Sequence, residues 1–178
     1  MGILGLGRIG KAMARRAKGF GMRVFYTDHK HQLEAEKELG IEYAPFEQML
    51  QESDFVTLHT YLSPETYHLF GDKQFKMMKP NAILVNTARG GIIDSDALFR
   101  ALKDKTIAAA GLDVTEPEPI PMNSPLLSLD NLVITPHIGS ASYATRARMA
   151  VMTAENLLAG LKGERLPYCA NPGVYEAA

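Results

Sequence analysis

The chain opens with Met1-Gly-Ile-Leu-Gly-Leu-Gly-Arg-Ile-Gly10, in which glycines stand at positions 5, 7 and 10. A short apolar run precedes the first of these glycines, and the residues that follow the last have the apolar spacing of a helix. In such a strand-turn-helix unit Gly5 permits a tight turn, Gly7 lets the backbone approach a pyrophosphate, and Gly10 lets helix and strand pack closely. The stretch therefore predicts a dinucleotide-binding turn, although a glycine-rich turn without a ligand is the alternative.

Two charged residues extend this prediction. Arg8, inside the motif, can contact the phosphates directly. Asp28 ends the second predicted strand, where it can accept hydrogen bonds from the adenosine ribose hydroxyls and would repel the 2′-phosphate of NADP. NAD is therefore the expected cofactor. The basic pair of His29 and Lys30 leaves NADP possible, and a surface aspartate that caps the next helix is the alternative interpretation of Asp28.

Apolar runs of strand length alternate with segments of helical spacing along the whole sequence, which predicts consecutive βα units. Several runs are apolar throughout, as in parallel strands buried on both faces, so we expect an α/β fold with a doubly wound parallel sheet. The expected strands are 2–4, 23–26, 55–58, 83–86, 109–114 and 132–135. The expected helices are 9–19, 32–39, 46–51, 73–77, 95–103 and 141–160, and the proline-rich segment 116–125 is expected to be an irregular loop.

Composition narrows the possible partners and location. The 178 residues fit one domain, and the net charge of −1 provides no attraction for nucleic acid or for an anionic membrane. No apolar run approaches the roughly 20 residues of a membrane span, and the N-terminus does not resemble a secretory signal. The single cysteine, Cys169, cannot form an internal disulfide, which favours a reducing compartment such as the cytoplasm.

Polar residues follow three of the predicted strands at their carboxyl ends, where open α/β sheets bind ligands. Arg89 stands between a strand and two glycines, and its guanidinium could hold a carboxylate in bidentate fashion. His137 precedes the last helix, and an imidazole is a natural proton donor in the reduction of a ketone. A carboxylate beside it would keep the protonated form available, but spacing alone does not decide among Asp113, Glu116 and Glu118. Taken singly, each of these residues could also be an ordinary surface or structural residue.

Four motifs occur in order along the chain: Gly-Leu-Gly-Arg-Ile-Gly at 5–10, Asn-Thr-Ala-Arg-Gly-Gly at 86–91, Ala-Gly-Leu-Asp-Val-Thr-Glu-Pro-Glu-Pro at 110–119 and Thr-Pro-His-Ile-Gly-Ser at 135–140. This set resembles the D-isomer-specific 2-hydroxyacid dehydrogenases, and within them the glyoxylate/hydroxypyruvate reductases. The resemblance covers essentially the whole chain. It implies a Rossmann-type domain that binds NAD, or possibly NADP, in an oxidoreductase that reduces a small 2-keto acid to the D-2-hydroxy acid.

The resemblance also implies roles for individual residues, with no metal among them. Arg89 would bind the substrate carboxylate and carbonyl, His137 would be the general acid and base, and Glu118 would pair with His137. The nicotinamide side of the cofactor site would include Thr87, Ala88, Arg89, Asp113 and His137, with Gly139 and Ser140 beside the histidine. The pyrophosphate and adenosine side would include Gly5, Gly7, Arg8, Ile9, Gly10, Asp28, His59, Thr60 and Thr66, although Tyr61 stands where many members have proline.

Members of this family also have a separate substrate domain, whose two stretches flank the cofactor domain. Met1 falls just inside the first strand of the cofactor domain, so we expect residues 1–166 to form the dinucleotide-binding domain. Residues 167–178 would begin the crossing toward a substrate domain that is largely absent. Family members dimerise through the cofactor domain, which implies a homodimer. Without the substrate domain to exclude water, turnover would be poor.

Two functions from other classes stay open. The family fold is also used by transcriptional corepressors, so the chain could be an NAD-sensing interaction protein. It could also be a truncated pseudoenzyme that binds NAD and dimerises. Association with a partner that depends on NADH, without consumption of a keto acid, would distinguish these from an enzyme.

Overall fold

The computed structural model describes residues 1–176 and divides into two compact units after His137. The first unit contains β1 (Gly2–Leu4), α1 (Arg8–Gly19), β2 (Phe25–Thr27), α2 (Leu33–Leu39), β3 (Glu42–Tyr43), α3 (Phe46–Glu52), β4 (Phe55–Leu58), α4 (Asp72–Met77), β5 (Ile83–Asn86), α5 (Ser95–Lys103), β6 (Ala109–Leu112) and β7 (Leu132–Ile134). The second unit contains the long helix α6 (Tyr143–Leu161) and a short 3-10 turn, Pro172–Tyr175. The expected domain boundary at residue 166 stays a prediction.

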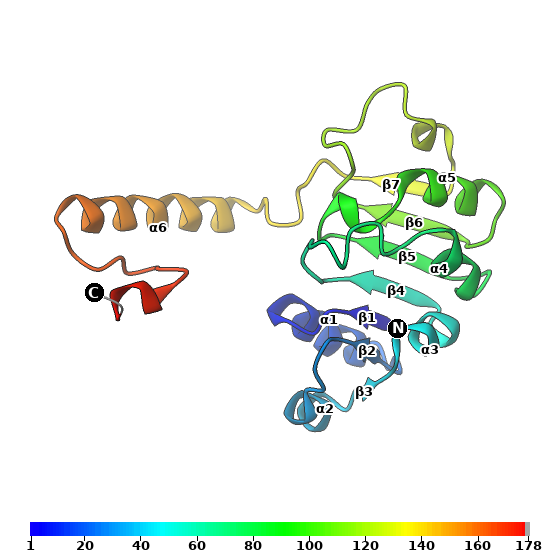
Figure 1. Cartoon of the computed structure of the whole chain (residues 1–178), viewed down its shortest axis with the longest axis horizontal. Coiled ribbons are helices and arrows are strands. Elements are labelled where there is room, and N and C mark those ends of the chain that lie inside the picture. The colour runs from blue at the N-terminus through cyan, green and yellow to red at the C-terminus, as the bar shows by residue number, and fades with distance from the viewer. Residues whose placement is uncertain (177–178) are drawn as a thin grey trace. The chain divides into compact units, whose positions relative to one another are not determined.

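All seven strands are parallel and form one sheet in the order β3-β2-β1-β4-β5-β6-β7 (Figure 1). The order reverses between β1 and β4, the two strands on either side of the topological switch point of a doubly wound sheet. The predicted fold class is therefore confirmed. Because the strands are parallel, their carboxyl ends all meet at one edge of the sheet.

The core consists of two layers, one on each face of the sheet. Ile3 and Tyr26 point to one face, where they pack with residues of α1 and α2. Leu4 and Phe25, their neighbours in sequence, point to the opposite face and join the larger cluster beneath α3, α4 and α5. This alternation within β1 and β2 follows from the two-residue period of a strand and explains why both strands are apolar on both faces.

Local capping sets the bounds of several helices. The carboxylate of Asp94 accepts hydrogen bonds from the backbone N–H groups of Asp96 (3.0 Å) and Ala97 (3.1 Å), which starts α5. Gly40 ends α2 in the left-handed conformation, with φ of 60°, as glycine at this position commonly does. Pro45 immediately precedes α3, where its missing N–H costs no hydrogen bond.

The structure differs from the sequence prediction mainly at the edges of elements. Strand β3 was not predicted, because two residues at the sheet edge are too short to produce an alternating pattern. Strand β6 ends at Leu112 and not at 114, because Leu112 pairs with the last residues of β5 and β7. The proline-rich loop ends in a single 3-10 turn, Pro125–Ser128, and α6 begins at Tyr143 and not at 141.

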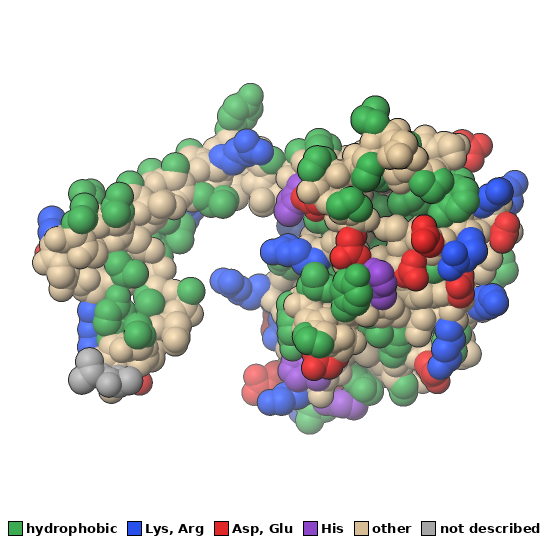
Figure 2. Space-filling view, turned by 45° about the horizontal axis from the view of Figure 1, so that its top comes forward, with side chains coloured by type: hydrophobic (Ala, Val, Ile, Leu, Met, Phe, Trp, Pro, Cys, Tyr) green, Lys and Arg blue, Asp and Glu red, His purple; other side chains and the backbone are tan. Residues whose placement is uncertain are grey.

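The surface of the first unit mixes charges of both signs. Figure 2 shows basic and acidic side chains interspersed over the visible face of this unit, in keeping with the net charge of −1. Across residues 1–176, the helices that the structure describes include none with both the length and the apolar character needed to cross a bilayer.

Tyr26 provides a test of the packing between β2 and α2. Its side chain is fully buried, its hydroxyl donates to Glu36 (2.6 Å), and the hydroxyl accepts from the N–H of Gln32 (2.7 Å). Burial raises the pKa of Tyr26 to about 12, and the bond to Glu36 adds to the shift. We expect Tyr26→Phe to lower the free energy of unfolding by about 1–2 kcal/mol at neutral pH, through the lost hydrogen bonds.

The pH dependence follows from the same shift. A tyrosine whose pKa is higher in the folded than in the unfolded protein stabilises the fold fully below its unfolded pKa, about 10, and loses that contribution as pH rises toward about 12. Denaturant unfolding between pH 9 and 12 should therefore show a steeper loss of stability in the wild type than in Tyr26→Phe. Tyr143→Phe, at a residue that is 97% exposed, is the matched control. Parallel pH profiles for wild type and Tyr26→Phe would contradict this assignment.

Candidate active site

The polar residues singled out in the sequence lie mostly along the carboxyl edge of the sheet. Asp28 follows β2 and Asp113 follows β6, each one position beyond the strand. His59 follows β4 in the same way, and Thr87 directly follows β5. The parallel arrangement of the strands therefore brings residues from distant parts of the sequence to one side of the first unit.

The glycine turn between β1 and α1 has the geometry of a phosphate cradle. Gly5 has φ of 90°, and a Cβ on it would lie 2.8 Å from the backbone of His59 and Thr60. A Cβ on Gly10 would lie 2.1 Å from the carbonyl oxygen of Gly5, so helix and turn are packed too closely for a side chain. A Cβ on Gly7 would meet nothing within 4 Å, which leaves open space where a ligand would approach.

The N-terminus of α1 adds donors to this open space. No side chain caps the helix, and its first turn carries no acidic residue among the described residues. The side chains of Arg8 and Ile9 are exposed at this end. A helix N-terminus with these properties fits a pyrophosphate, through its N–H groups and the positive end of its dipole.

Asp28 lies beside the glycine turn. Its Oδ2 accepts a hydrogen bond from the backbone N–H of Leu6 (2.8 Å), and its Oδ1 accepts from the N–H of His29 (2.7 Å). Asp28 does not cap α2, because that helix starts after Gln32 and has no side-chain cap. The imidazole Nδ1 of His29 lies 2.6 Å from Oδ1 of Asp28, so the neighbouring histidine turns toward the carboxylate.

The segment after β4 packs against the same turn. Burial lowers the pKa of His59, whose Nε2 lies 3.0 Å from the hydroxyl of Thr57, so the ring is neutral at neutral pH. The Thr66 hydroxyl accepts a hydrogen bond from the N–H of Ser63 (2.8 Å) and donates to the carbonyl of Tyr61 (2.8 Å). Thr66 therefore holds this loop together through its own side chain, while the backbone of His59 and Thr60 faces Gly5.

A buried asparagine shapes the turn that carries Arg89. The side chain of Asn86 is inaccessible to solvent; it donates to the carbonyl of Arg89 (2.9 Å) and accepts from the N–H of Ala88 (3.0 Å). These two bonds close the turn Thr87–Arg89 at the end of β5. The Arg89 side chain is exposed, and its Nη1 donates to the carbonyl of Ala88 (2.6 Å).

Gly90 brings this turn against the loop that follows β6. A Cβ on Gly90 would lie 2.0 Å from the carbonyl oxygen of Thr115, which only glycine avoids. The segment after Arg89 is thus in backbone contact with the loop that carries Glu118. The sequence predicted that the glycines at 90 and 91 let the backbone approach a ligand, whereas the close contact of Gly90 is with the backbone of Thr115. It assigned no role to Asn86, although a polar residue at the end of an apolar strand was a usable signal.

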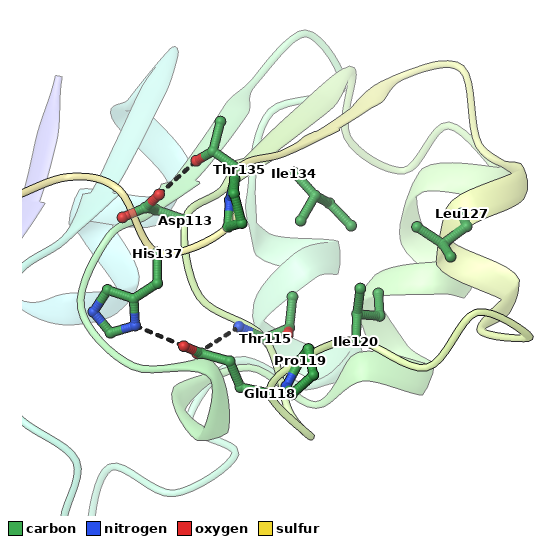
Figure 3. Close-up of a pocket in the computed structure, with 10 residues that line it drawn as sticks. Asp113, Thr115, Glu118, Pro119, Ile120, Leu127, Ile134, Thr135 and His137 are labelled. Carbon is green, nitrogen blue, oxygen red and sulfur yellow. Dashed lines mark hydrogen bonds and ion pairs between the residues drawn. The ribbon is translucent and has the colours of Figure 1, made fainter. Parts of the chain in front are cut away.

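Asp113 and Thr135 fix the start of the His137 turn. The Thr135 hydroxyl donates to Oδ1 of Asp113 (2.6 Å), and the N–H of His137 donates to the carbonyl oxygens of Asp113 and Thr135, both at 3.0 Å (Figure 3). These bonds hold His137 at φ of 54°, in the left-handed region that non-glycine residues seldom occupy. The turn presents the imidazole from this conformation.

His137 and Glu118 form a directly hydrogen-bonded pair. Nδ1 of His137 lies 2.6 Å from Oε1 of Glu118, and the N–H of Thr115 donates to the other carboxylate oxygen at 3.4 Å (Figure 3). The hydrogen bond from His137 holds the pKa of Glu118 below its usual range, with a further contribution from the N–H of Thr115. Glu118 orients the ring through Nδ1, which leaves Nε2 as the nitrogen that can exchange a proton with a ligand.

A cavity of about 510 Å³ lies beside this pair. Figure 3 shows the polar residues on one side of it and Ile120, Leu127 and Ile134 on the other. Its full lining is Asp113, Thr115, Glu118, Pro119, Ile120, Leu127, Ile134, Thr135, Pro136 and His137. Among the expected cofactor residues, Gly139 and Ser140 belong to the second unit and not to the unit that holds this cavity.

The first unit coincides closely with a known family domain. Residues 1–139 match the family model described as D-isomer specific 2-hydroxyacid dehydrogenase, NAD binding domain. The chain is 57% identical over 174 residues to a glyoxylate reductase of Korarchaeum cryptofilum, covering 98% of this chain and 52% of that protein. It is 50% identical over 175 residues to a glyoxylate/hydroxypyruvate reductase B of Enterobacter agglomerans, covering 98% and 54%. The chain thus spans about half the length of these relatives.

Solved structures show the same likeness. The TT0316 protein of Thermus thermophilus superposes with a TM-score of 0.87 at 49% identity, over 93% of this chain and 51% of that one. An NAD-complexed D-isomer specific 2-hydroxyacid dehydrogenase of Lactobacillus delbrueckii ssp. bulgaricus superposes with a TM-score of 0.85 at 34% identity, over 96% and 55%. By its sequence match and its fold, this chain belongs to the D-isomer specific 2-hydroxyacid dehydrogenase family and carries that family's NAD-binding domain.

Proposed function

We propose that this chain forms the NAD-binding and proton-transferring part of an enzyme that reduces a small 2-keto acid, such as glyoxylate or hydroxypyruvate, to the 2-hydroxy acid, the D-isomer where that acid is chiral. The observation that carries the proposal is the His137–Glu118 pair, with 2.6 Å between Nδ1 and Oε1, on a loop in backbone contact with the Arg89 turn. An imidazole backed by a carboxylate suits proton transfer, and the exposed guanidinium of Arg89 on the contacting turn suits a carboxylate substrate. A protein that only senses NAD needs neither group.

The residues of the glycine turn would hold the cofactor. Gly7 leaves room for the pyrophosphate, and Gly5 and Gly10 allow the close packing that shapes the turn, with Arg8 and Ile9 at the N-terminus of α1. Asp28, His59, Thr60 and Thr66 would lie toward the adenosine half, and Thr87, Ala88 and Asp113 toward the nicotinamide half. When bound, NADH would supply the hydride that adds to the carbonyl carbon of the substrate.

The side chains of the chain itself would orient the substrate and move the proton. The Arg89 guanidinium binds the substrate carboxylate and polarises the adjacent carbonyl. His137 donates a proton from Nε2 to the carbonyl oxygen as it becomes an alcohol, and it takes the proton back in the reverse direction. Glu118, ionised because its pKa is held low, orients the imidazole through its hydrogen bond to Nδ1.

Asp28 would select NADH over NADPH. Its carboxylate lies against the glycine turn through the Leu6 N–H, where a ribose 2′-phosphate would bring like charge close to it. His29, which faces the same carboxylate, is the residue that would favour a phosphate instead.

We also propose that the protein is a homodimer and lies in the cytoplasm. The free cysteine Cys169 supports the location, because unpaired cysteines are typical of a reducing compartment.

Replacement of His137 tests the catalytic part of the proposal. In a preparation that oxidises NADH with glyoxylate, we expect His137→Ala to lower kcat by about 10²- to 10⁴-fold, the usual contribution of a general acid. The dissociation constant for NADH, followed by nucleotide fluorescence, should change less than about twofold, since the glycine turn is untouched. His31→Ala is the control for removal of a partly exposed histidine. Turnover at the wild-type rate in His137→Ala would rule out the assignment.

Replacement of Asp28 tests the choice of cofactor. Asp28→Asn keeps an oxygen that can accept from Leu6 and removes the charge. We expect the preference for NADH over NADPH, measured as the ratio of dissociation constants, to fall about 10-fold, equivalent to about 1.4 kcal/mol. Asp72→Asn, which removes a charge paired with Arg100 on α5, is the control. A wild-type chain that binds NADPH as tightly as NADH would overturn the role given to Asp28.

A further inference from the structure

A second histidine-glutamate pair includes a glutamate on the loop that carries Glu118. Nε2 of His68 lies 2.7 Å from Oε2 of Glu116, two positions before Glu118 in the sequence. His68 comes from the segment between β4 and α4, so the pair joins parts of the chain 48 residues apart. The mechanism proposed above does not use it.

The backbone of His68 contacts the segment that follows Arg89. Its N–H donates to the carbonyl of Gly91 (2.8 Å), and the N–H of Phe70 donates to the carbonyl of Ile92 (3.0 Å). Residue 68 is thus bound by its main chain to the Arg89 turn and by its side chain to the Glu118 loop. His68 thus adds a side-chain hydrogen bond to the Gly90 backbone contact between these two segments.

Further contacts fix the orientation of both partners. The imidazole of His68 stacks on Tyr67, with 3.9 Å between ring centroids and 15° between planes. The Ser95 hydroxyl donates to the carbonyl of Glu116 (3.2 Å). His68 has φ of 48°, a left-handed conformation that histidine adopts more readily than most residues.

The pair is not placed to stabilise the fold. The side chains of His68 and Glu116 are 36% and 37% exposed, and ion pairs as open as this contribute little to global stability. Its effect is local: it limits how far the Glu116–Glu118 stretch can move from the segment after Arg89. Because a substrate would be held by Arg89 and protonated by His137, this separation determines whether both groups reach it at once.

We propose that His68 is a positioning residue of the site, which acts through its hydrogen bond to Glu116 to hold the Glu118 loop against the Arg89 turn. The effect that we expect His68 to have on catalysis rests on the proposed function. The structural consequence, a restrained position of the loop that carries Glu118, is independent of activity. The hydrogen bond from His137 is the main cause of the lowered pKa of Glu118, so movement of Glu118 away from His137 would raise that pKa.

Three variants distinguish the effect of losing this hydrogen bond from an effect on folding. His68→Asn suits the left-handed backbone but is too short to reach Glu116, whereas His68→Gln has an amide that can reach it. Glu116→Ala breaks the bond from the other partner. His31→Asn is the matched control, because His31 also stacks on a tyrosine, Tyr43 (3.6 Å), and lies near a carboxylate, Glu36 (3.8 Å).

The first measurement is the pKa of the Glu118 carboxyl in the whole chain, by carbon-detected NMR titration. We expect the pKa to rise toward the usual glutamate range in His68→Asn and Glu116→Ala, and to stay at the wild-type value in His68→Gln and His31→Asn. An unchanged Glu118 pKa in folded His68→Asn, or an equal rise in His68→Gln, would overturn the proposal. If His68→Asn does not fold, Glu116→Ala decides in the same way.

The second measurement is turnover in a preparation that reduces glyoxylate. We expect kcat to fall about 10-fold or more in His68→Asn, with KM for NADH within about twofold and with recovery in His68→Gln. A loss confined to KM for NADH would contradict positioning of Glu118. Failure of the proposed function would appear separately, as a wild-type protein that consumes no 2-keto acid, and would leave the Glu118 pKa as the test of His68.

Discussion

Parallel strand direction is the constraint on which the site depends. Because all seven strands run the same way, the loops after β1, β2, β4, β5, β6 and β7 leave the sheet at one edge. Two glycines then bring those loops into contact: Gly5 against the backbone of residues 59–60, and Gly90 against Thr115. With a side chain at either position the loops would be forced apart. The cradle and the His137–Glu118 pair thus result from one topology and two close backbone contacts.

Much of this arrangement could be predicted from the sequence because its signals are local. The glycines at 5, 7 and 10 stand between a strand and a helix, and only one kind of turn suits that spacing. Strands β1, β4 and β5 and helix α5 have the predicted bounds, since apolar runs and an aspartate cap define their ends. Glu118 could not be chosen over Asp113 and Glu116 from sequence spacing. Only the resemblance to a family favoured Glu118 as the partner of the histidine.

What the sequence could not reveal depends on contacts between distant segments. Strand β3 has two residues and exists because β2 offers it an edge. Asn86 lies at the end of a predicted strand. Its role in closing the Arg89 turn depends on the hydrogen bonds that its side-chain amide makes to the backbone of Ala88 and Arg89. His68 lies in a loop without any motif, and its partner Glu116 is one of three nearby acids. These contacts form only when the chain folds, so they cannot be predicted from a short stretch of sequence.

In the proposed function, one edge of the first unit binds NADH along the glycine turn and presents its nicotinamide end to His137. The most direct measurement is a titration of the isotopically labelled chain with NADH, followed by backbone amide NMR. We predict saturable shifts both in residues 5–10 and in residues 113 and 137, which lie at opposite ends of the proposed cofactor site. Absence of saturable binding, or shifts that spare either group of residues, would contradict it.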